Sequence, residues 1–166
     1  IMLYAQVTPY DPNKLAALQN KLTQVEIKSE KASVLLDLHD QLMYSNVAEA
    51  YTYNNQALNL AQNLDDKVLM SRAFGNKGNE YFDEADLDKA LYYYLKSSDL
   101  IDIEEQPLIM ALNFSNMANV FALKGDYPTS MEYAYRAIAL CKKSPTGLNL
   151  RCHTRANLAE SYVSLQ

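Results

Sequence analysis

Apolar and polar residues alternate along this chain with the spacing of helices. Between residues 71 and 84, Phe74, Gly78 and Tyr81 follow one another at intervals of four and three, which places them on one helix face. Asp86 is a residue type that caps helices, and a second stripe of helical spacing follows it. This stripe contains Leu87, Ala90, Leu91, Tyr94 and Leu95. The pattern predicts two helices joined by a turn.

The same pattern returns forty residues later. The corresponding pairs are Phe74 and Phe114, Gly78 and Ala118, Tyr81 and Phe121, Ala90 and Ser130, and Ser97 and Ala137. A fixed period of about 20 to 50 residues is typical of stacked supersecondary units. Gly78 and Ala90 are small, as expected where the two helices of one unit cross. The repeat therefore predicts a series of helical hairpins.

The period predicts a leading segment, residues 1–30, and repeats over residues 31–166. Asp11 and Pro12 begin a leading helix. The repeats comprise 31–70, 71–110 and 111–150, and residues 151–166 restart a first helix without a second. We expect eight helices, with QNLDDKVLM and IEEQPLIM contributing to longer links. The four Gly and five Pro mostly fall between periodic segments, which also favours an all-α chain.

These hairpins resemble the tetratricopeptide repeat family, in which a large residue, a small residue and an aromatic residue mark the first helix. The residues that carry the resemblance are Phe74, Gly78, Tyr81, Ala90 and Tyr94, then Phe114, Met117, Ala118, Phe121, Ser130 and Ala137. Lys77 and Leu38 depart from the pattern. The resemblance implies an all-α, right-handed solenoid of antiparallel hairpins with a concave groove. The forty-residue period resembles repeats of bacterial sensor kinases and transcription regulators more than the family's basic repeat of about 34 residues.

Composition narrows the range of functions. The net charge of -5 disfavours a nucleic-acid-binding surface, which needs clustered Lys and Arg. No stretch approaches the roughly 20 apolar residues of a membrane span. The start of the chain permits two interpretations, the end of a signal peptide around Ala5 or an ordinary terminus at Met2, so the compartment stays open between cytoplasm and periplasm. We expect Cys141 and Cys152 to be thiols, with a disulfide as the alternative in an oxidising compartment.

No set of residues predicts catalysis. His39 and His153 have no neighbour that would complete a zinc motif, and Gly75 and Gly78 lie within a helix instead of a phosphate-binding loop. We therefore expect a protein that is not an enzyme and that uses no metal and no cofactor. The run Tyr92 to Tyr94 spreads over about 200° of a helix, so we interpret Tyr94 as a core residue and its neighbours as flanking residues.

The resemblance implies that the first helix of each hairpin lines the groove. The candidate groove residues are His39, Arg72, Gly75, Asn79, Phe82, Asp83, Ser115, Asn119 and Glu160. We expect Asn79 and Asn119 to bind a peptide backbone, because a carboxamide offers donors and an acceptor. The alternative is that both are solvated. We expect Asn76, Asn116 and Asn157 to be structural. Family members that bind a terminal carboxylate carry a Lys where this chain has Leu35, Gly75 and Ser115, which disfavours that activity.

The predicted function is non-catalytic binding of a protein or peptide in the groove. Our leading hypothesis is the sensory or interaction portion of a larger bacterial protein of signal transduction or transcription regulation. The alternatives are a self-contained scaffold that assembles a complex, and a receptor for a short signalling peptide. The sequence names no partner and no oligomeric state.

Overall fold

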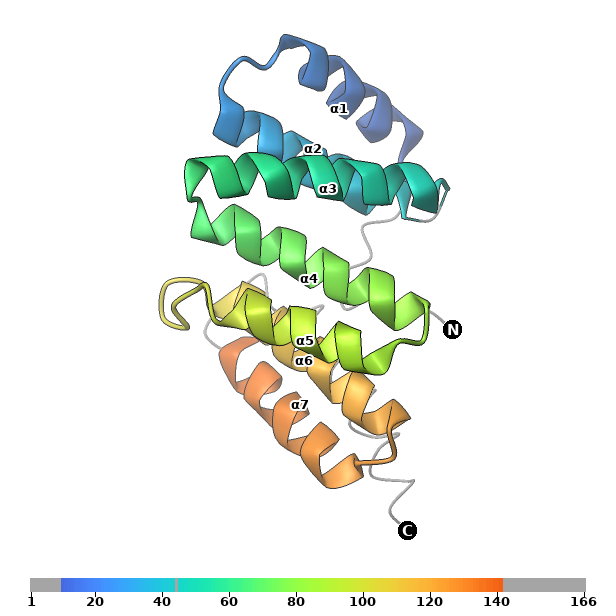
Figure 1. The fold of residues 1–166 in the computed structure, drawn as a ribbon, viewed down its shortest axis with the longest axis vertical. Coiled ribbons are helices and arrows are strands. Elements are labelled where there is room, and N and C mark those ends of the chain that lie inside the picture. Colours follow the sequence, from blue (N-terminus) through green and yellow to red (C-terminus); the bar gives the residue numbers. More distant parts are fainter. Residues whose placement is uncertain (1–9, 44, 142–166) are drawn as a thin grey trace. The chain divides into compact units, whose positions relative to one another are not determined.

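The computed structural model describes residues 10–43 and 45–141 of the 166-residue chain. This part contains seven α-helices and no strand, so the all-α prediction is confirmed for it (Figure 1). The helices are α1 (Pro12–Gln24), α2 (Lys28–Leu42), α3 (Val47–Leu64), α4 (Lys67–Asp83), α5 (Leu87–Ser98), α6 (Pro107–Leu123) and α7 (Tyr127–Cys141). The eighth helix, expected over 151–166, lies outside the described residues.

The chain divides into two compact units, and the division falls within α4, between Asn76 and Lys77. The N-terminal unit contains α1, α2, α3 and the first part of α4. The C-terminal unit contains the rest of α4 with α5, α6 and α7. Within them, α2 packs beside α3 and α6 beside α7, each pair joined by a short turn (Figure 1).

The forty-residue period of the sequence is also the period of the helices. Helices α4 and α6 begin forty residues apart and end forty residues apart, and so do the starts of α3, α5 and α7. The side chain that caps each of these last three helices recurs at the same interval. Asn46, Asp86 and Asp126 accept a hydrogen bond from the backbone N–H three residues ahead, at 3.3, 3.2 and 3.2 Å. Each cap satisfies one of the N–H groups that a helix start leaves unpaired.

Part of each expected link belongs to a helix. Helices α4 and α6 begin at Lys67 and Pro107, within the sequences QNLDDKVLM and IEEQPLIM. The physical reasons are local. The carboxylate of Asp66 accepts from the N–H of Leu69 at 3.0 Å, and Pro107 occupies the first turn of α6, where its missing N–H costs nothing.

The core of the N-terminal unit is aliphatic. Helix α2 contributes fully buried leucines, and α3 and α4 contribute alanines that allow close approach of the backbones. Its buried members are Ala32, Leu35, Leu36, Ala57, Ala61, Leu69 and Ala73.

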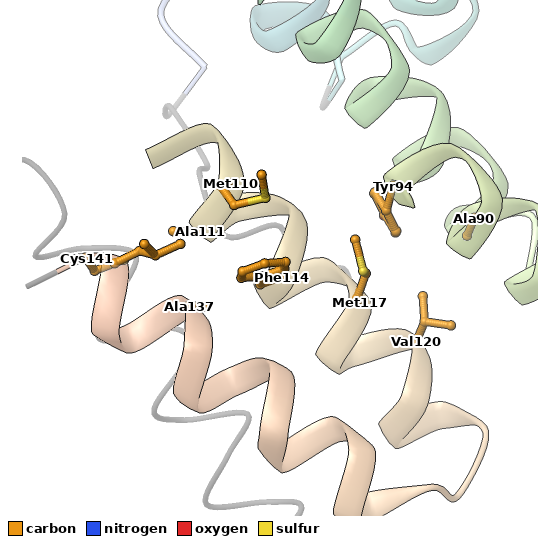
Figure 2. Packing of buried hydrophobic residues seen from close by; sticks show 10 residues of the cluster. Ala90, Tyr94, Met110, Ala111, Phe114, Met117, Val120, Ala137 and Cys141 are labelled. Carbon is orange, nitrogen blue, oxygen red and sulfur yellow. The ribbon is translucent and has the colours of Figure 1, made fainter. Parts of the chain in front are cut away.

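The core of the C-terminal unit is richer in aromatic side chains and sulfur (Figure 2). It contains Ala90, Tyr94, Met110, Ala111, Phe114, Met117, Val120, Ala137, Leu140 and Cys141. Tyr94 is only 1% exposed, and its ring lies directly against Gly78 of α4. Cys141 is fully buried, whereas Cys152 lies outside the described residues, so the expectation of thiols stays a prediction.

Candidate functional site

The predicted groove residues are distributed over both units. His39, Arg72 and Gly75 belong to the N-terminal unit, and Asn79, Phe82, Asp83, Ser115 and Asn119 belong to the C-terminal unit. Glu160 lies outside the described residues.

His39 is buried within the N-terminal unit. The residue is 2% exposed, and its Nδ1 lies 3.0 Å from Oδ1 of Asp40, the next residue on α2. Among the residues that the structure describes, none forms a hydrogen bond with its Nε2. The sequence placed His39 in an open groove, but an imidazole enclosed in this way offers little surface to a ligand.

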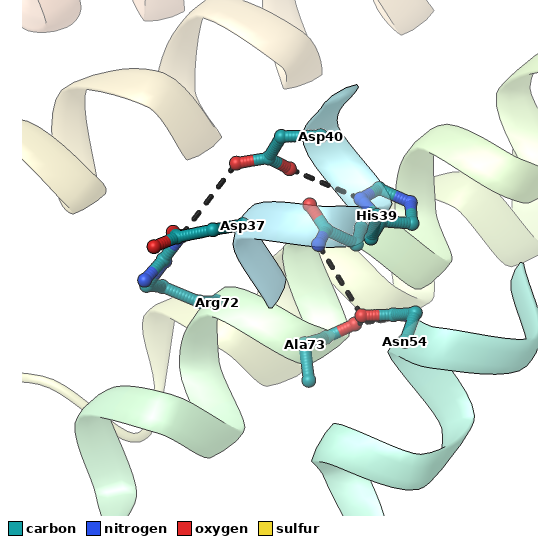
Figure 3. A network of polar contacts seen from close by, with 7 residues as sticks. Asp37, His39, Asp40, Asn54, Arg72 and Ala73 are labelled. Carbon is teal, nitrogen blue, oxygen red and sulfur yellow. Dashed lines mark hydrogen bonds and ion pairs between the residues drawn. The ribbon is translucent and has the colours of Figure 1, made fainter. Parts of the chain in front are cut away.

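Arg72 reaches from α4 to the acidic side chains of α2 (Figure 3). Its Nη2 lies 3.2 Å from Oδ1 of Asp37 and 3.6 Å from Oδ2 of Asp40. The three side chains are between 31% and 42% exposed. Ion pairs with this much solvent contact contribute about 0–1 kcal/mol to stability. Arg72 thus joins neighbouring helices while its charge remains near water.

Asn54 forms a buried polar link that the sequence did not reveal. It is fully buried on α3, and its Nδ2 donates to the carbonyl oxygen of Ala73 at 3.1 Å (Figure 3). Its Oδ1 accepts from Nδ2 of Asn76 at 3.2 Å. Asn54 stands forty residues before Tyr94, so an amide occupies the position that the next unit gives to an aromatic ring.

In the C-terminal unit, Asn79 of α4 is the centre of a second polar link. Its Oδ1 accepts hydrogen bonds from the hydroxyl of Tyr94 at 2.8 Å and from Nδ2 of Asn116 at 3.1 Å. Asn79 and Asn116 are each partly exposed. The first helices of two successive hairpins, α4 and α6, therefore hold two carboxamides next to each other at the protein surface.

The other candidates in this unit differ in exposure. Asp83 is exposed, while Asn119 and Phe82 are partly buried and Phe82 packs against the aromatic core. Ser115 is fully buried, so its side chain adds no exposed surface to the expected groove. A polar surface around Asn79, Asp83, Asn116 and Asn119 is what remains of the expected stripe.

The tyrosine run behaves as its helical spacing predicts. Tyr94 lies in the core, Tyr93 stacks on Tyr81 with centroids 5.3 Å apart, and Tyr92 is 56% exposed. The stack recurs forty residues later between Tyr133 and Phe121, at 5.5 Å. These rings join the first and second helices of the hairpins α4–α5 and α6–α7. The interpretation of Tyr94 as a core residue and of its neighbours as flanking residues is confirmed.

A shallow acidic hollow lies at the turn between α4 and α5. Glu84, Asp86, Leu87, Asp88 and Lys124 line it. Lys124 pairs with Asp88, and Lys89 pairs with Asp86 at 2.8 Å. The hydrogen bond from Lys89 lowers the pKa of Asp86 below its ordinary value. The carboxylates of this hollow are therefore largely partnered by lysines.

Two further properties concern the described residues alone. Over residues 10–43 and 45–141, no three His, Cys, Asp or Glu side chains gather in a way that could hold a metal ion. In the same part of the chain, no helix combines the length and the apolar character needed to cross a membrane.

Comparison with known proteins adds no relative. No protein-family model matches the chain, and no curated protein matches it either.

Proposed function

We propose that this chain is a tetratricopeptide-like, right-handed α-solenoid that binds an extended segment of a protein along the first helices of its hairpins. The observation that carries the proposal is the pair of carboxamides of Asn79 and Asn116. These amides come from successive first helices, lie 3.1 Å apart between Nδ2 and Oδ1, and are partly exposed. Paired amides suit a peptide backbone, because each peptide group also has one donor and one acceptor.

The surroundings of the pair support a protein ligand over a small apolar one. Asp83 is exposed on the same helix as Asn79, and Asn119 lies one turn beyond Asn116 on α6. Polar groups in such a row can follow an extended chain, whose backbone groups recur about every 3.3 Å along a strand. The leading hypothesis, based on the resemblance of the repeats, is that this chain is the sensory portion of a bacterial signalling or transcription-regulatory protein.

A second candidate function is a scaffold that uses the second helices instead. Tyr92 and Leu95 on α5 are 56% and 43% exposed, and Tyr135 on α7 is 57% exposed. Exposed aromatic side chains are enriched in protein interfaces. A scaffold of this kind would bind its partner without Asn79 or Asn116.

The test selects phage-displayed random dodecapeptides on the purified chain and measures the affinity of the selected peptides by calorimetry. The double variant Asn79→Ala/Asn116→Ala should weaken binding about tenfold or more, because buried backbone groups of the peptide lose their partners. Asn59→Ala/Asn63→Ala, at exposed positions of α3, is the matched control. Unchanged affinity in the first variant, with loss in Tyr92→Ala/Tyr135→Ala, would establish the scaffold.

The hypothesis that this chain is a portion of a larger signalling protein has its own test. An immunoblot of the source cells gives the mass of the native product. A product several times larger than 18.8 kDa supports a portion of a signalling protein, and one close to 18.8 kDa supports a free-standing adaptor.

A further inference from the structure

The carboxamide of Asn79 has a defined direction. Both hydrogen bonds that the structure gives it end on Oδ1, and they come from Tyr94 and Asn116. Its Nδ2 makes no hydrogen bond to any described residue. We infer that Tyr94 fixes this direction, so that position 79 offers N–H donors and no acceptor to a bound segment. The nature of that segment rests on the proposed function, but the direction of the amide does not.

Tyr94 is suited to hold the amide because its ring is fixed by packing and its hydroxyl keeps its proton. The ring is 1% exposed and lies against Gly78. Burial, with a smaller effect from the charge of Asp83, raises the pKa of Tyr94 well above the ordinary value of 10.0. The hydroxyl therefore stays protonated and donates to Oδ1 of Asn79 at 2.8 Å.

The role of Asn116 as the second donor to Oδ1 of Asn79 is supported by the equivalent asparagine of the other unit. Asn76, forty residues before Asn116, donates its Nδ2 to Oδ1 of Asn54 at 3.2 Å. Both asparagines thus turn their nitrogen toward an amide oxygen of their own unit. In the C-terminal unit this leaves Oδ1 of Asn116 as an acceptor beside the donors of Asn79.

The direction of these amides limits what can bind there. A group opposite Nδ2 of Asn79 must be a hydrogen-bond acceptor, such as a carbonyl, carboxylate or hydroxyl oxygen. Asp83 is exposed four residues later on α4, on the same side of the helix, and would repel a carboxylate. A neutral acceptor is therefore favoured, and in an extended segment the acceptor that every residue supplies is the backbone carbonyl, with a backbone N–H directed to Asn116. A proline at the ligand position that faces Asn116 has no backbone N–H to donate, so it would prevent binding.

Solvent exchange of side-chain amide protons, measured by NMR on the whole ¹⁵N-labelled chain, tests the direction without any ligand. We expect one Hδ2 proton of Asn116 to exchange about tenfold more slowly than those of exposed Asn59, and neither Hδ2 proton of Asn79 to be slowed in this way. A slowed proton on Asn79, or the lack of one on Asn116, would overturn the inference.

Tyr94→Phe tests the positioning role, because it keeps the ring and removes the donor. In this variant we expect the ¹³Cγ resonance of Asn79 to shift while that of Asn59 stays unchanged. A purely structural role of Tyr94 would lower the melting temperature without moving the Asn79 resonance selectively, and that result would contradict the inference.

Two small probes test the ligand chemistry, namely N,N-dimethylacetamide as a neutral carbonyl and acetate as a carboxylate. At equal concentrations, the neutral carbonyl should shift the Asn79 Nδ2 resonances more than acetate does, and more than it shifts those of Asn59. A larger effect of acetate would refute the assignment of a neutral carbonyl. If the peptide selection fails while the exchange pattern is as expected, the proposed function is wrong and the direction of the amide stands.

Discussion

The backbone of Gly78 adjoins the ring of Tyr94 so closely that a methyl group has no room between them. A Cβ atom at residue 78 would lie 2.5 Å from Cδ1 and 2.9 Å from Cζ of Tyr94. The ring cannot move aside easily, since it is buried and its hydroxyl is bonded to Asn79. This contact explains why the first helix of the hairpin carries glycine at its centre, although glycine is a poor helix former.

Gly78→Ala should therefore destabilise the protein by about 1–3 kcal/mol, despite the better helix propensity of alanine. Urea denaturation followed by circular dichroism measures the change. The double variant Gly78→Ala/Tyr94→Ala is the matched control, because it reproduces the pair Ala118 and Ala134 of the next hairpin. Its cost should fall short of the sum of the single changes by at least about 0.5 kcal/mol. Additive costs would show that the two residues do not interact.

Tyr94 should make the protein sensitive to alkali. Its pKa in the folded state is raised above the ordinary value of 10.0, mainly by burial, so only the unfolded chain releases this proton just above that pH. The stabilising contribution is complete below pH 10.0 and is lost as the pH rises toward the folded-state pKa. Denaturation midpoints between neutral pH and pH 11 should fall less steeply for Tyr94→Phe than for the wild-type protein. Equal slopes would contradict the expectation.

Asp86 should give the opposite pH dependence of stability, with stability lost as the pH falls. The hydrogen bond from Lys89 lowers its pKa below the ordinary value of 3.8, and its carboxylate also caps α5. Its contribution is present above that ordinary value and disappears as the pH falls through the folded-state pKa. Asp86→Asn keeps a capping side chain but cannot titrate. Thermal unfolding between pH 5 and pH 2 should therefore show a shallower loss in the variant, and an identical loss would argue against the contribution.

Asn54 should be costly to remove. Replacing it by alanine deprives Asn76 of its acceptor and leaves a cavity beside Ala73 in a fully buried place. We expect a loss of about 1–3 kcal/mol in the free energy of unfolding. Asn55→Ala changes an exposed neighbour on the same helix and should stay within about 0.5 kcal/mol of the wild type. Similar losses in both variants would mean that the buried link does not stabilise the fold.

The sequence predicted those features that depend on local chemistry and on periodicity. The helical class, the forty-residue period, the cap at Asp86 and the burial of Tyr94 follow from spacing and residue type, and the described residues confirm them. The helical part of the links QNLDDKVLM and IEEQPLIM was not apparent, because these sequences contain both helix-forming and turn-forming residues.

The candidate site was less predictable because side-chain partners come from distant parts of the chain. The two residues that donate to Oδ1 of Asn79 are Tyr94, fifteen residues away in the sequence, and Asn116, thirty-seven residues away. Neither contact can be read from the local spacing. The structural role expected for Asn116 agrees with its hydrogen bond to Asn79, and its part in binding is proposed from that contact. The burial of His39 and Ser115 likewise depends on neighbouring helices and not on their own spacing.

Where the two helices of a hairpin face each other, the hairpins α2–α3 and α4–α5 distribute large and small side chains differently. The N-terminal unit has Leu38 and Asn54, both fully buried, whereas the C-terminal unit has Gly78 and Tyr94. If α2 paired with α5 in place of α4, Leu38 would face the ring of Tyr94, and a leucine is far larger than the hydrogen atom that fits there. Residue volumes therefore let α5 discriminate between two first helices of similar sequence. During folding, this discrimination would favour pairing in chain order and reject hairpins assembled from the wrong repeats.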